Sequence, residues 1–187
     1  MILDFSIIAK ATGCNENNIK NNWPKIEECL KEEGILDLNT CYAVASTIAV
    51  ECGKSFNPIK EFGGKDENNY FTKMYEGRKD LGNIEKGDGP KFKGRGYCMI
   101  TGRYWYTFYS KLLKIDLINN PDLALDPTIS AKILAHYFKQ HKINEAANAK
   151  DWVKVRKLVN GGKNGLPEFL NCLKNFGVYS PQPTVKK

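Results

Sequence analysis

The sequence predicts a mainly helical protein of the α+β class, with at most a small β-hairpin. Apolar residues recur at helical spacing along most of the 187 residues, and residues that start or stop helices flank these stretches. One long segment, Tyr75–Arg103, is too rich in glycine to be helical. With 42% hydrophobic and 26% charged residues, the composition is typical of a globular protein. We therefore expect one two-lobed domain over residues 1–178 and a flexible polar tail at 179–187.

Two helices are predicted in the first half of the chain. The first is expected to begin at Pro24, because proline fixes a helical φ angle and needs no N–H at a first position, and to end at Gly34. The second is expected to begin at Asn39, whose side chain can cap open backbone N–H groups, and to end at Gly53. Apolar residues between these ends recur at helical spacing, so both helices should face the core.

Four further helices are predicted in the second half. Asp126 and Asp151 are expected to cap two of them, and Gly161 and Gly177 are expected to end two of them. In each helix large apolar residues recur three or four positions apart, as on the buried side of a helix. The four helices are predicted at residues 104–112, 126–138, 151–161 and 167–177.

The glycine-rich segment between these halves must turn sharply several times. Seven glycines in Tyr75–Arg103 allow positive φ angles and close approach of the backbone to other groups. Loops with such detail often carry function. Arg95, between two of the glycines, is expected to hold the loop against a carboxylate. Strand signals are limited to Tyr70–Phe71 and Tyr97–Thr101, which we expect to pair as the hairpin.

Charge and composition limit the classes of partner. The formal net charge of +7 favours polyanions, which include nucleic acid, anionic membranes and anionic cell walls. The basic residues are spread out and do not form a base-reading patch, which argues against nucleic acid. The longest apolar run, Tyr42–Val50, is too short to span a bilayer, and the N-terminus lacks a signal peptide pattern. Six cysteines without CxxC spacing predict a reduced, cytosolic protein.

Glu51 is the first candidate for chemistry. It is predicted to lie on the apolar side of its helix and in the last turn, where the helix dipole is negative. Both surroundings disfavour a carboxylate, so we expect a raised pKa and a proton available for general acid catalysis. The alternative is a helix-end glutamate that reaches solvent or pairs with a lysine.

Glu61 and Glu76 are the main candidates for a second carboxylate across a cleft. Glycoside hydrolysis commonly uses two carboxyl groups, roughly 6.5–9.5 Å apart when a water must fit between them. Either residue could instead be a solvated charge, and Glu76 could form a structural ion pair with Arg78. Thr101 could orient a catalytic water or cap the helix that follows it.

The remaining candidates would contact sugar. Aromatic rings such as Tyr70 and Tyr97 could stack on sugar rings, and Asn160 could present its amide to one. The two histidines lack HExxH spacing, and no phosphate-binding loop or nucleophile elbow occurs, so neither a metal nor a cofactor is expected. The predicted substrate-binding residues are Tyr70, Arg78, Arg95, Tyr97 and Asn160.

Five motifs in a fixed order resemble those of family 19 glycoside hydrolases. They are VECGKSF, YEGRKDLGN, GDGPKFKGRGYCMITGRYWY, NPDLALDP and VNGGKNG. The similarity extends from about residue 5 to about residue 175. Within the chitinase-like, lysozyme-like superfamily, the chain resembles phage endolysins and related bacterial muramidase-type proteins. This resemblance implies a lysozyme-like fold of two lobes around a catalytic cleft.

The resemblance also implies roles for individual residues. Glu51 matches the general acid, and Thr101 matches the residue that positions water. The general base of an inverting mechanism falls on Glu76 in one alignment and near Glu61 in another. Asn160 matches a substrate-contacting asparagine. The chain departs from the family at three positions: Val50 replaces histidine or arginine, Cys52 replaces serine or threonine, and Met99 replaces glutamine.

These matches predict a monomeric peptidoglycan hydrolase of the endolysin type. It would cleave the β-1,4 bond between N-acetylmuramic acid and N-acetylglucosamine. The alternatives are a chitinase on the same fold and a wall-binding protein without catalysis, which the Met99 and Cys52 departures would suit. We expect a cytoplasmic protein, in the host cytoplasm if a phage encodes it, that acts on the cell wall after release.

Overall fold

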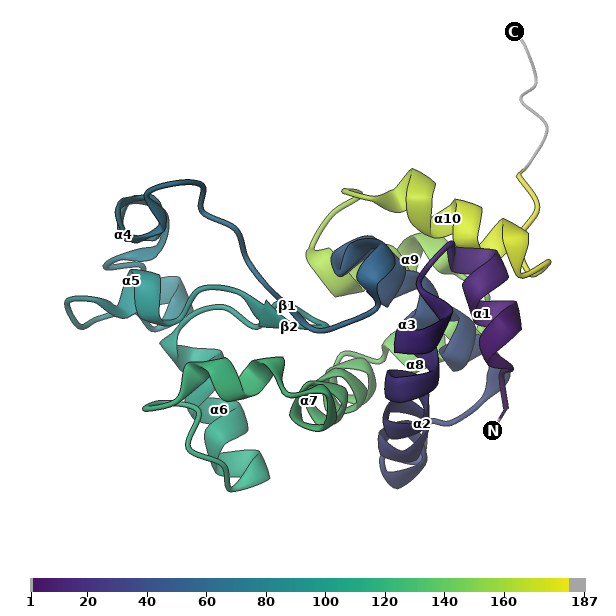
Figure 1. Ribbon diagram of the computed structural model, residues 1–187, viewed down its shortest axis with the longest axis horizontal. Coiled ribbons are helices and arrows are strands. Elements are labelled where there is room, and N and C mark those ends of the chain that lie inside the picture. Colours follow the sequence, from purple (N-terminus) through teal and green to yellow (C-terminus); the bar gives the residue numbers. More distant parts are fainter. Residues whose placement is uncertain (1, 182–187) are drawn as a thin grey trace, which may run out of the picture. The chain divides into compact units, whose positions relative to one another are not determined.

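The computed structural model describes residues 2–181; residue 1 and residues 182–187, and with them most of the predicted tail, lie outside the described residues. The prediction of a mainly helical fold with a small pair of strands is confirmed (Figure 1). No helix in this part of the chain is long and apolar enough to cross a membrane. The elements are α1 (Phe5–Thr12), α2 (Glu16–Glu32), α3 (Leu38–Glu51), η1 (Gly53–Ser55), β1 (Ile59–Lys60), α4 (Glu67–Tyr75), η2 (Lys79–Leu81), α5 (Asp88–Lys91), β2 (Arg95–Gly96), α6 (Arg103–Leu113), η3 (Pro121–Leu125), α7 (Pro127–Gln140), α8 (Ile143–Asn148), α9 (Trp152–Asn160) and α10 (Leu166–Asn175), where η marks a 3₁₀ helix.

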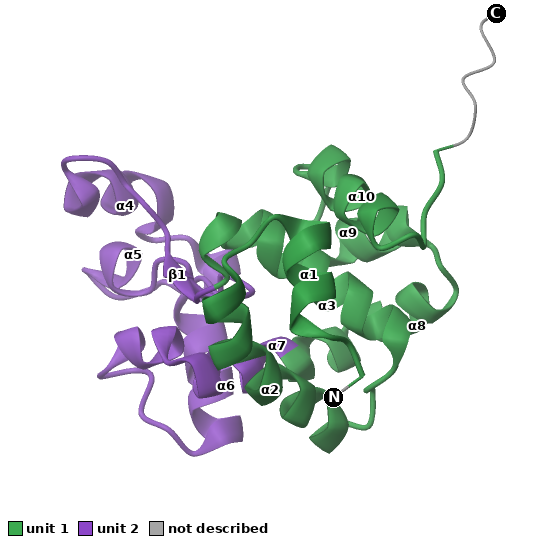
Figure 2. Cartoon of the chain, turned by 45° about the vertical axis from the view of Figure 1, so that its right-hand side comes forward, with its two compact units in different colours: residues 1–56, 135–187 green, residues 57–134 purple. Residues whose placement is uncertain are grey.

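The elements form two compact units (Figure 2). The first unit combines residues 1–56 with residues 135–187, and the second is the continuous segment 57–134. Helix α7 contributes residues to both units, because the boundary falls within it. Glu51 therefore belongs to the first unit, and Glu61 belongs to the second.

Helix α3 is the central helix of the first unit. Helices α1, α8, α9 and α10 all pack against it. Most of its residues are small or apolar, and the stretch 43–48 is buried, as expected for a helix with neighbours on several sides. The predicted cap Asn39 is wrong, because the side chain of Asp37 accepts the backbone N–H of Thr40 at 2.9 Å and its hydroxyl at 2.8 Å. This buried helix fixes the position of its last residue, Glu51.

Helix α2 begins well before the predicted start at Pro24. Asn15 caps it by accepting the backbone N–H of Asn18 at 3.0 Å, and Pro24 lies in its middle. The proline is tolerated there on the exposed side, where water can bind the carbonyl that lacks an N–H partner. The first part of α2 was not predicted because its sequence, ENNIKNN, is mostly polar. Helices α1 and α8 were also missed, because both are short.

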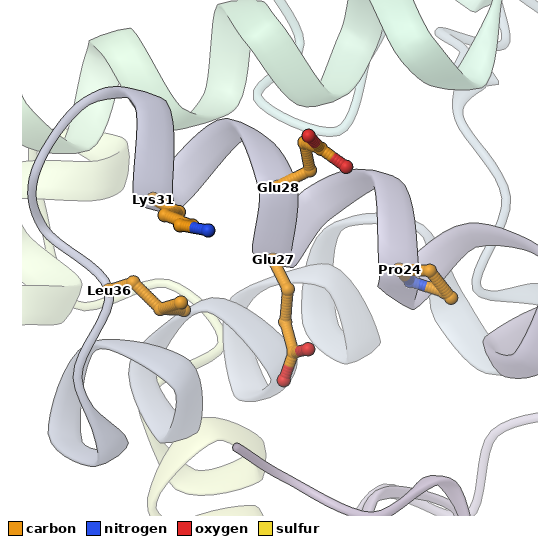
Figure 3. A pocket seen from close by; sticks show the side chains of 5 residues that line it. All are labelled: Pro24, Glu27, Glu28, Lys31 and Leu36. Carbon is orange, nitrogen blue, oxygen red and sulfur yellow. The ribbon is translucent and has the colours of Figure 1, made fainter. Parts of the chain in front are cut away.

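Glu27, which lines a small pocket in the first unit, holds the N-terminal segment in place. The lining of the pocket includes Pro24, Glu27, Glu28, Lys31 and Leu36 (Figure 3). One carboxylate oxygen of Glu27 accepts the backbone N–H of Ile2 at 2.8 Å, that of Leu3 at 3.2 Å and the indole N–H of Trp23 at 3.0 Å. The buried carboxylate thus satisfies three donors and ties the chain start to α2.

The pair of strands in the second unit is not the predicted one. β1 and β2 run antiparallel, with Ile59 opposite Gly96 and Lys60 opposite Arg95. Tyr70–Phe71 lies in α4, because the side chain of Asp66 caps this helix by accepting the backbone N–H of Asn69. The other predicted stretch turns back on itself, since the backbones of Arg95 and Ile100 exchange two hydrogen bonds.

Part of the glycine-rich segment is held by a buried ion pair between Asp88 and Arg103. The carboxylate of Asp88 accepts two bonds from the guanidinium, at 2.6 and 2.8 Å, and the backbone N–H groups of Ile84 and Glu85 at 3.0 Å. Burial acts to raise the pKa of Asp88, but these hydrogen bonds outweigh it and hold the pKa below its usual range. The segment is also anchored by a hydrophobic core that includes Phe92, Tyr106 and Tyr109.

Candidate active site

The carboxylate of Glu51 forms an ion pair with Arg156. The side chain of Glu51 is 21% exposed, and Arg156, which is 2% exposed, donates from Nη1 to Oε1 at 2.5 Å. The sequence argument assumed apolar surroundings for Glu51, and this assumption is wrong. A guanidinium orients the carboxylate, while the exposed part of the side chain stays accessible.

A short loop after α9 holds Arg156 in turn. Its Nε donates to the carbonyl of Asn164 at 2.7 Å. The side-chain amide of Asn160 donates to the same carbonyl at 2.8 Å, and its oxygen accepts the backbone N–H of Gly162 at 3.0 Å. The VNGG motif therefore builds the loop that fixes the partner of Glu51. The predicted contact of Asn160 with substrate stays a prediction.

Replacing Gly165 by Ala is expected to disturb this loop far more than replacing Gly161 by Ala. Both glycines have positive φ angles, +69° and +72°, so both substitutions strain the backbone. A Cβ at Gly165 would lie 2.6 Å from Val50 Cγ1 and 3.0 Å from Arg156 Nη2, whereas one at Gly161 meets nothing within 4 Å. We expect Gly165→Ala to lower the free energy of unfolding by about 1–3 kcal/mol more than Gly161→Ala. Urea unfolding of both variants checks this, and equal losses would contradict it.

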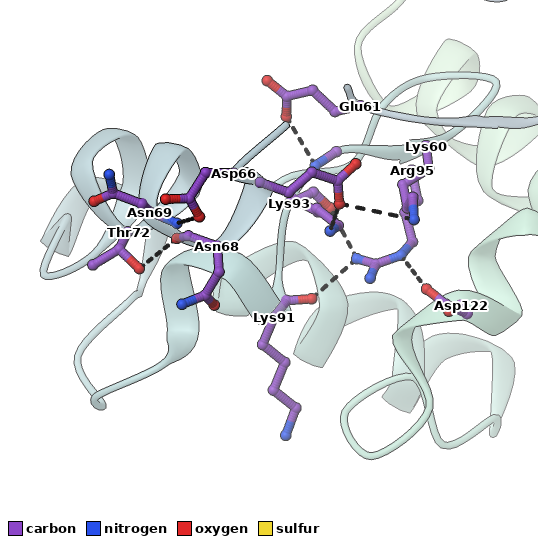
Figure 4. Close-up of polar contacts among 12 residues, drawn as sticks. Lys60, Glu61, Asp66, Asn68, Asn69, Thr72, Lys91, Lys93, Arg95 and Asp122 are labelled. Atoms are coloured by element: carbon purple, nitrogen blue, oxygen red, sulfur yellow. Dashed lines mark hydrogen bonds and ion pairs between the residues drawn. The ribbon is translucent and has the colours of Figure 1, made fainter. Parts of the chain in front are cut away.

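Glu61 follows β1 in the second unit and is held by two donors. The hydroxyl of Tyr75 donates to Oε1 at 2.7 Å. The backbone N–H of Gly94 donates to Oε2 at 3.1 Å, and Figure 4 shows the Glu61 carboxylate that receives this bond. Burial, followed by the hydrogen bond to Glu61, raises the pKa of the Tyr75 hydroxyl above its usual range. Tyr75 thus keeps its proton and acts as a donor. These contacts orient the carboxylate and leave lone pairs open for another donor.

Thr101 lies beside Glu61. A Cβ placed on Gly94 would lie 3.1 Å from Glu61 Oε2, 3.2 Å from Met99 Cε and 3.3 Å from Thr101 Oγ1, so all three side chains surround one glycine. The hydroxyl of Thr101 donates to the carbonyl of Met99 at 2.9 Å. The capping alternative for Thr101 is wrong, because Gly102 is the N-cap of α6 and no side chain caps that helix. A carboxylate and a hydroxyl so close together can share one water molecule.

Glu76 has different surroundings. Its two oxygens accept the backbone N–H groups of Gly87 and Gly89 at 2.6 and 2.8 Å. The alternative ion pair of Glu76 with Arg78 is wrong, since Arg78 pairs with Asp80. The carboxylate of Glu76 therefore closes the loop before α5. Of the two candidates for the second carboxylate, the structure favours Glu61.

Arg95 holds the glycine-rich loop, as the sequence predicted. Its Nε donates to Asp122 at 2.6 Å, and its Nη1 donates to the carbonyls of Lys91 and Lys93 at 3.0 and 3.1 Å (Figure 4). Nη1 also donates to the hydroxyl of Tyr106 at 2.9 Å. Asp122 belongs to the NPDLA motif, so this ion pair joins two of the five motifs. Contacts of Arg95 and Arg78 with substrate stay predictions.

The two aromatic candidates differ in exposure. Tyr70 is 41% exposed on α4, and its ring packs edge-on against Phe71, so one face can receive a sugar. Tyr97 is only 1% exposed, and its backbone N–H donates to the hydroxyl of Ser130. The prediction that Tyr97 stacks on a sugar is therefore corrected, because its ring belongs to the core.

Two residues of the candidate site were missed in the sequence. Tyr75 lies in the YEGR motif, and its place one residue before Glu76 gave no sign of a bond to Glu61. Arg156 is 105 positions from Glu51 and lies on a helix with several other basic residues, so nothing in the sequence distinguished it. Contacts of this range depend on the tertiary fold.

Comparison with known proteins gives related sequences and folds. No family model matches the sequence. Over 97 residues the chain is 34% identical to a glycosyl hydrolase family 19 domain-containing protein of Haemophilus influenzae, a match to 52% of this chain and 46% of that protein. Over 61 residues it is 36% identical to an endochitinase of Pisum sativum, a match to 32% of this chain and 19% of that protein. The matches thus span less than half the length of either relative.

Solved structures agree with these matches. A mutant of chitinase C superposes with a TM-score of 0.66, and chitinase C from Streptomyces griseus superposes with a TM-score of 0.59. Each is 15% identical and covers 96% of this chain and 78% of the other. The chain has the chitinase-like fold of family 19 glycosyl hydrolases. The predicted resemblance to family 19 is thereby confirmed, and its motifs mark the segments that build the candidate site.

Proposed function

We propose that this chain is a glycoside hydrolase of the family 19 type that cleaves peptidoglycan. The bond cleaved is the β-1,4 bond between N-acetylmuramic acid and N-acetylglucosamine, and the anomeric carbon inverts. The observation that carries the proposal is the Glu61 carboxylate, held by Tyr75 and Gly94 with the Thr101 hydroxyl beside it. A held carboxylate with a hydroxyl beside it is what activation of a water molecule needs.

Glu51 acts as the general acid. In its protonated form it gives a proton to the oxygen of the bond to be broken, which leaves as a neutral alcohol. Arg156 orients the Glu51 side chain for this transfer and stabilises the carboxylate that remains. Arg156 is thus a positioning residue, since its other contact is with the loop carbonyl of Asn164.

Glu61 acts as the general base on the water. As the bond to the leaving oxygen breaks, the water oxygen bonds to the anomeric carbon from the opposite side, and a water proton passes to Glu61. The Thr101 hydroxyl donates to the Met99 carbonyl, so its oxygen lone pairs are the part that can hold the water. Water, two carboxyl groups and the sugar account for all atoms of the reaction.

The choice of peptidoglycan is supported by charge. The formal net charge of +7 favours an anionic wall polymer over neutral chitin. We propose that the protein acts as a monomer on the cell wall after its release from the cytoplasm. Chitin is the second candidate substrate, because an endochitinase is similar to part of this chain in sequence and two chitinase C structures are similar to it in fold. A wall-binding protein without activity is the third candidate.

Product analysis tests these candidates. Purified peptidoglycan and chitohexaose are incubated with the protein, the products are reduced with borohydride, and their masses are measured. We expect peptidoglycan fragments that end in reduced N-acetylmuramic acid. In a parallel reaction without borohydride, followed by NMR, the α-anomer of the new reducing end should form first. Fragments that end in reduced N-acetylglucosamine, or cleavage of chitohexaose alone, would refute the peptidoglycan assignment. Wall binding without any products would favour the third candidate.

A further inference from the structure

The second unit contains a pocket whose lining does not include Glu61. Its volume is about 490 Å³, within the range of pockets that hold small molecules. The end of α5, β2 and the start of η3 build it. In Figure 4 the side chain of Lys91, which lines the pocket, extends away from Glu61. It is lined by Lys91, Arg95, Asn119, Asn120, Pro121, Asp122 and Leu123.

One wall of this pocket is a buried guanidinium. Arg95 is 5% exposed, and its Nε and Nη1 donate to Asp122, to two carbonyls and to Tyr106. Its Nη2 has no hydrogen-bond partner among residues 2–181. Nη2 is not among the buried polar atoms without a partner, so its N–H groups reach solvent and can donate to a ligand that brings oxygen acceptors.

The other lining residues offer charge, amides and apolar surface. Lys91 is exposed, its ammonium group lies over the Phe92 ring, and its charge acts on Asp116, but no carboxylate of the described residues is within ion-pair distance of it. The charge of Asp122 is balanced by Arg95. Asp116, which does not line the pocket, accepts two bonds from Asn119, and the amide of Asn120 makes no bond within the described part of the chain. Leu123 is 38% exposed and adds apolar surface.

We propose that this pocket binds one acidic N-acetylated sugar residue without cleaving it. Lys91 receives the carboxylate, Asn120 and Arg95 Nη2 bind hydroxyl or acetamido oxygens, and Leu123 packs against the ring or its acetyl methyl group. A neutral sugar lacks the group that Lys91 recognises, and a free carboxylate lacks the ring that Leu123 covers. N-acetylmuramic acid carries both features. The pocket is therefore a binding site, outside the residues proposed for catalysis, for an N-acetylmuramic acid residue whose lactyl carboxylate is free, as it is once the stem peptide has been removed.

Titration of the ¹⁵N-labelled full chain followed by NMR tests the pocket. The probes are N-acetylmuramic acid, N-acetylglucosamine, which lacks the lactyl ether group and its carboxylate, and D-lactate, which lacks the ring. We expect the amide signals of Lys91 and Leu123 to shift when N-acetylmuramic acid is added. N-acetylglucosamine and D-lactate should each bind at least about fivefold more weakly, a difference in affinity that one partly exposed ion pair can supply. No movement of these signals, or equal binding of either other probe, would overturn the proposal.

A pair of lysine variants isolates the charge. Lys91→Met is expected to remove the preference for N-acetylmuramic acid over N-acetylglucosamine, while Lys111→Met, which removes an exposed lysine on α6 outside the pocket, keeps it. Lys111→Met should retain hydrolysis. A preference that survives Lys91→Met, or is lost in both variants, would contradict the assignment of the pocket. Because a monosaccharide has no bond to cleave, this result is independent of whether the proposed catalysis is right.

Discussion

Replacing Glu51 by Gln is expected to lower the rate of glycan hydrolysis by about 10²- to 10⁴-fold, the range that general acid catalysis contributes. Glutamine keeps the shape of the side chain and still accepts the bond from Arg156, but it has no acidic proton to give to the leaving oxygen. The rate is measured as reducing ends released from purified peptidoglycan. Substrate binding should change little, because the substitution removes the transferable proton and keeps the size and shape of the side chain.

The ion pair adds a stability effect that must be separated from catalysis. Arg156 is 2% exposed and loses a charged partner in Glu51→Gln, so we expect the free energy of unfolding to fall by about 1–3 kcal/mol. Assays well below the melting temperature avoid this effect. Glu28→Gln, the same change at an exposed position of α2, is the control and should keep full activity. Hydrolysis by Glu51→Gln within threefold of the unchanged protein would refute the role of Glu51 as the acid.

Replacing Glu61 by Gln and Glu76 by Gln should give opposite results. Glu61→Gln is expected to lower hydrolysis by about 10²- to 10⁴-fold with little loss of stability. The glutamine oxygen can still accept the Gly94 N–H, and the Tyr75 hydroxyl can turn to accept the new NH₂ group. The site keeps its hydrogen bonds and loses only its base.

Glu76→Gln is expected to keep the hydrolysis rate and to lower stability by about 1–3 kcal/mol. Its two oxygens accept two backbone N–H groups, and a glutamine must turn its NH₂ group toward one of them, so one buried donor loses its acceptor. Rates on peptidoglycan and urea unfolding of both variants distinguish the two roles. If Glu76→Gln abolishes hydrolysis at unchanged stability while Glu61→Gln does not, the base is Glu76.

Much of the fold could be predicted from local sequence. Helices α6, α7, α9 and α10 were predicted because each combines apolar spacing with a clear start or stop, as the Asp151 cap and Gly161 end of α9 show. The strand pair was misplaced because strands of two residues leave no alternation to detect. The start of α2 was missed because its first turns are polar and Pro24 resembled a helix start.

The candidate site was predicted in outline. The motifs named Glu51 and Thr101, and they left Glu61 and Glu76 as equal candidates for the second carboxylate. Only hydrogen bonds across the fold separated these two, since Glu76 binds two backbone N–H groups and Glu61 lies beside Thr101. Arg156 carries no sequence signal for its role, because a lysine-rich helix with one arginine is an ordinary surface pattern.

By itself, the sequence determined the helical class, the order of the five motifs and some residues of the candidate site, among them Glu51, Glu61 and Thr101. These features depend on local spacing and on residue type, which the chain carries without folding. Only the tertiary structure decided which donors each carboxylate meets: Arg156 for Glu51, Tyr75 and Gly94 for Glu61, and the loop before α5 for Glu76. The physical reason is that a hydrogen bond acts over about 3 Å, so a carboxylate's chemistry is set by neighbours that the fold brings from distant positions.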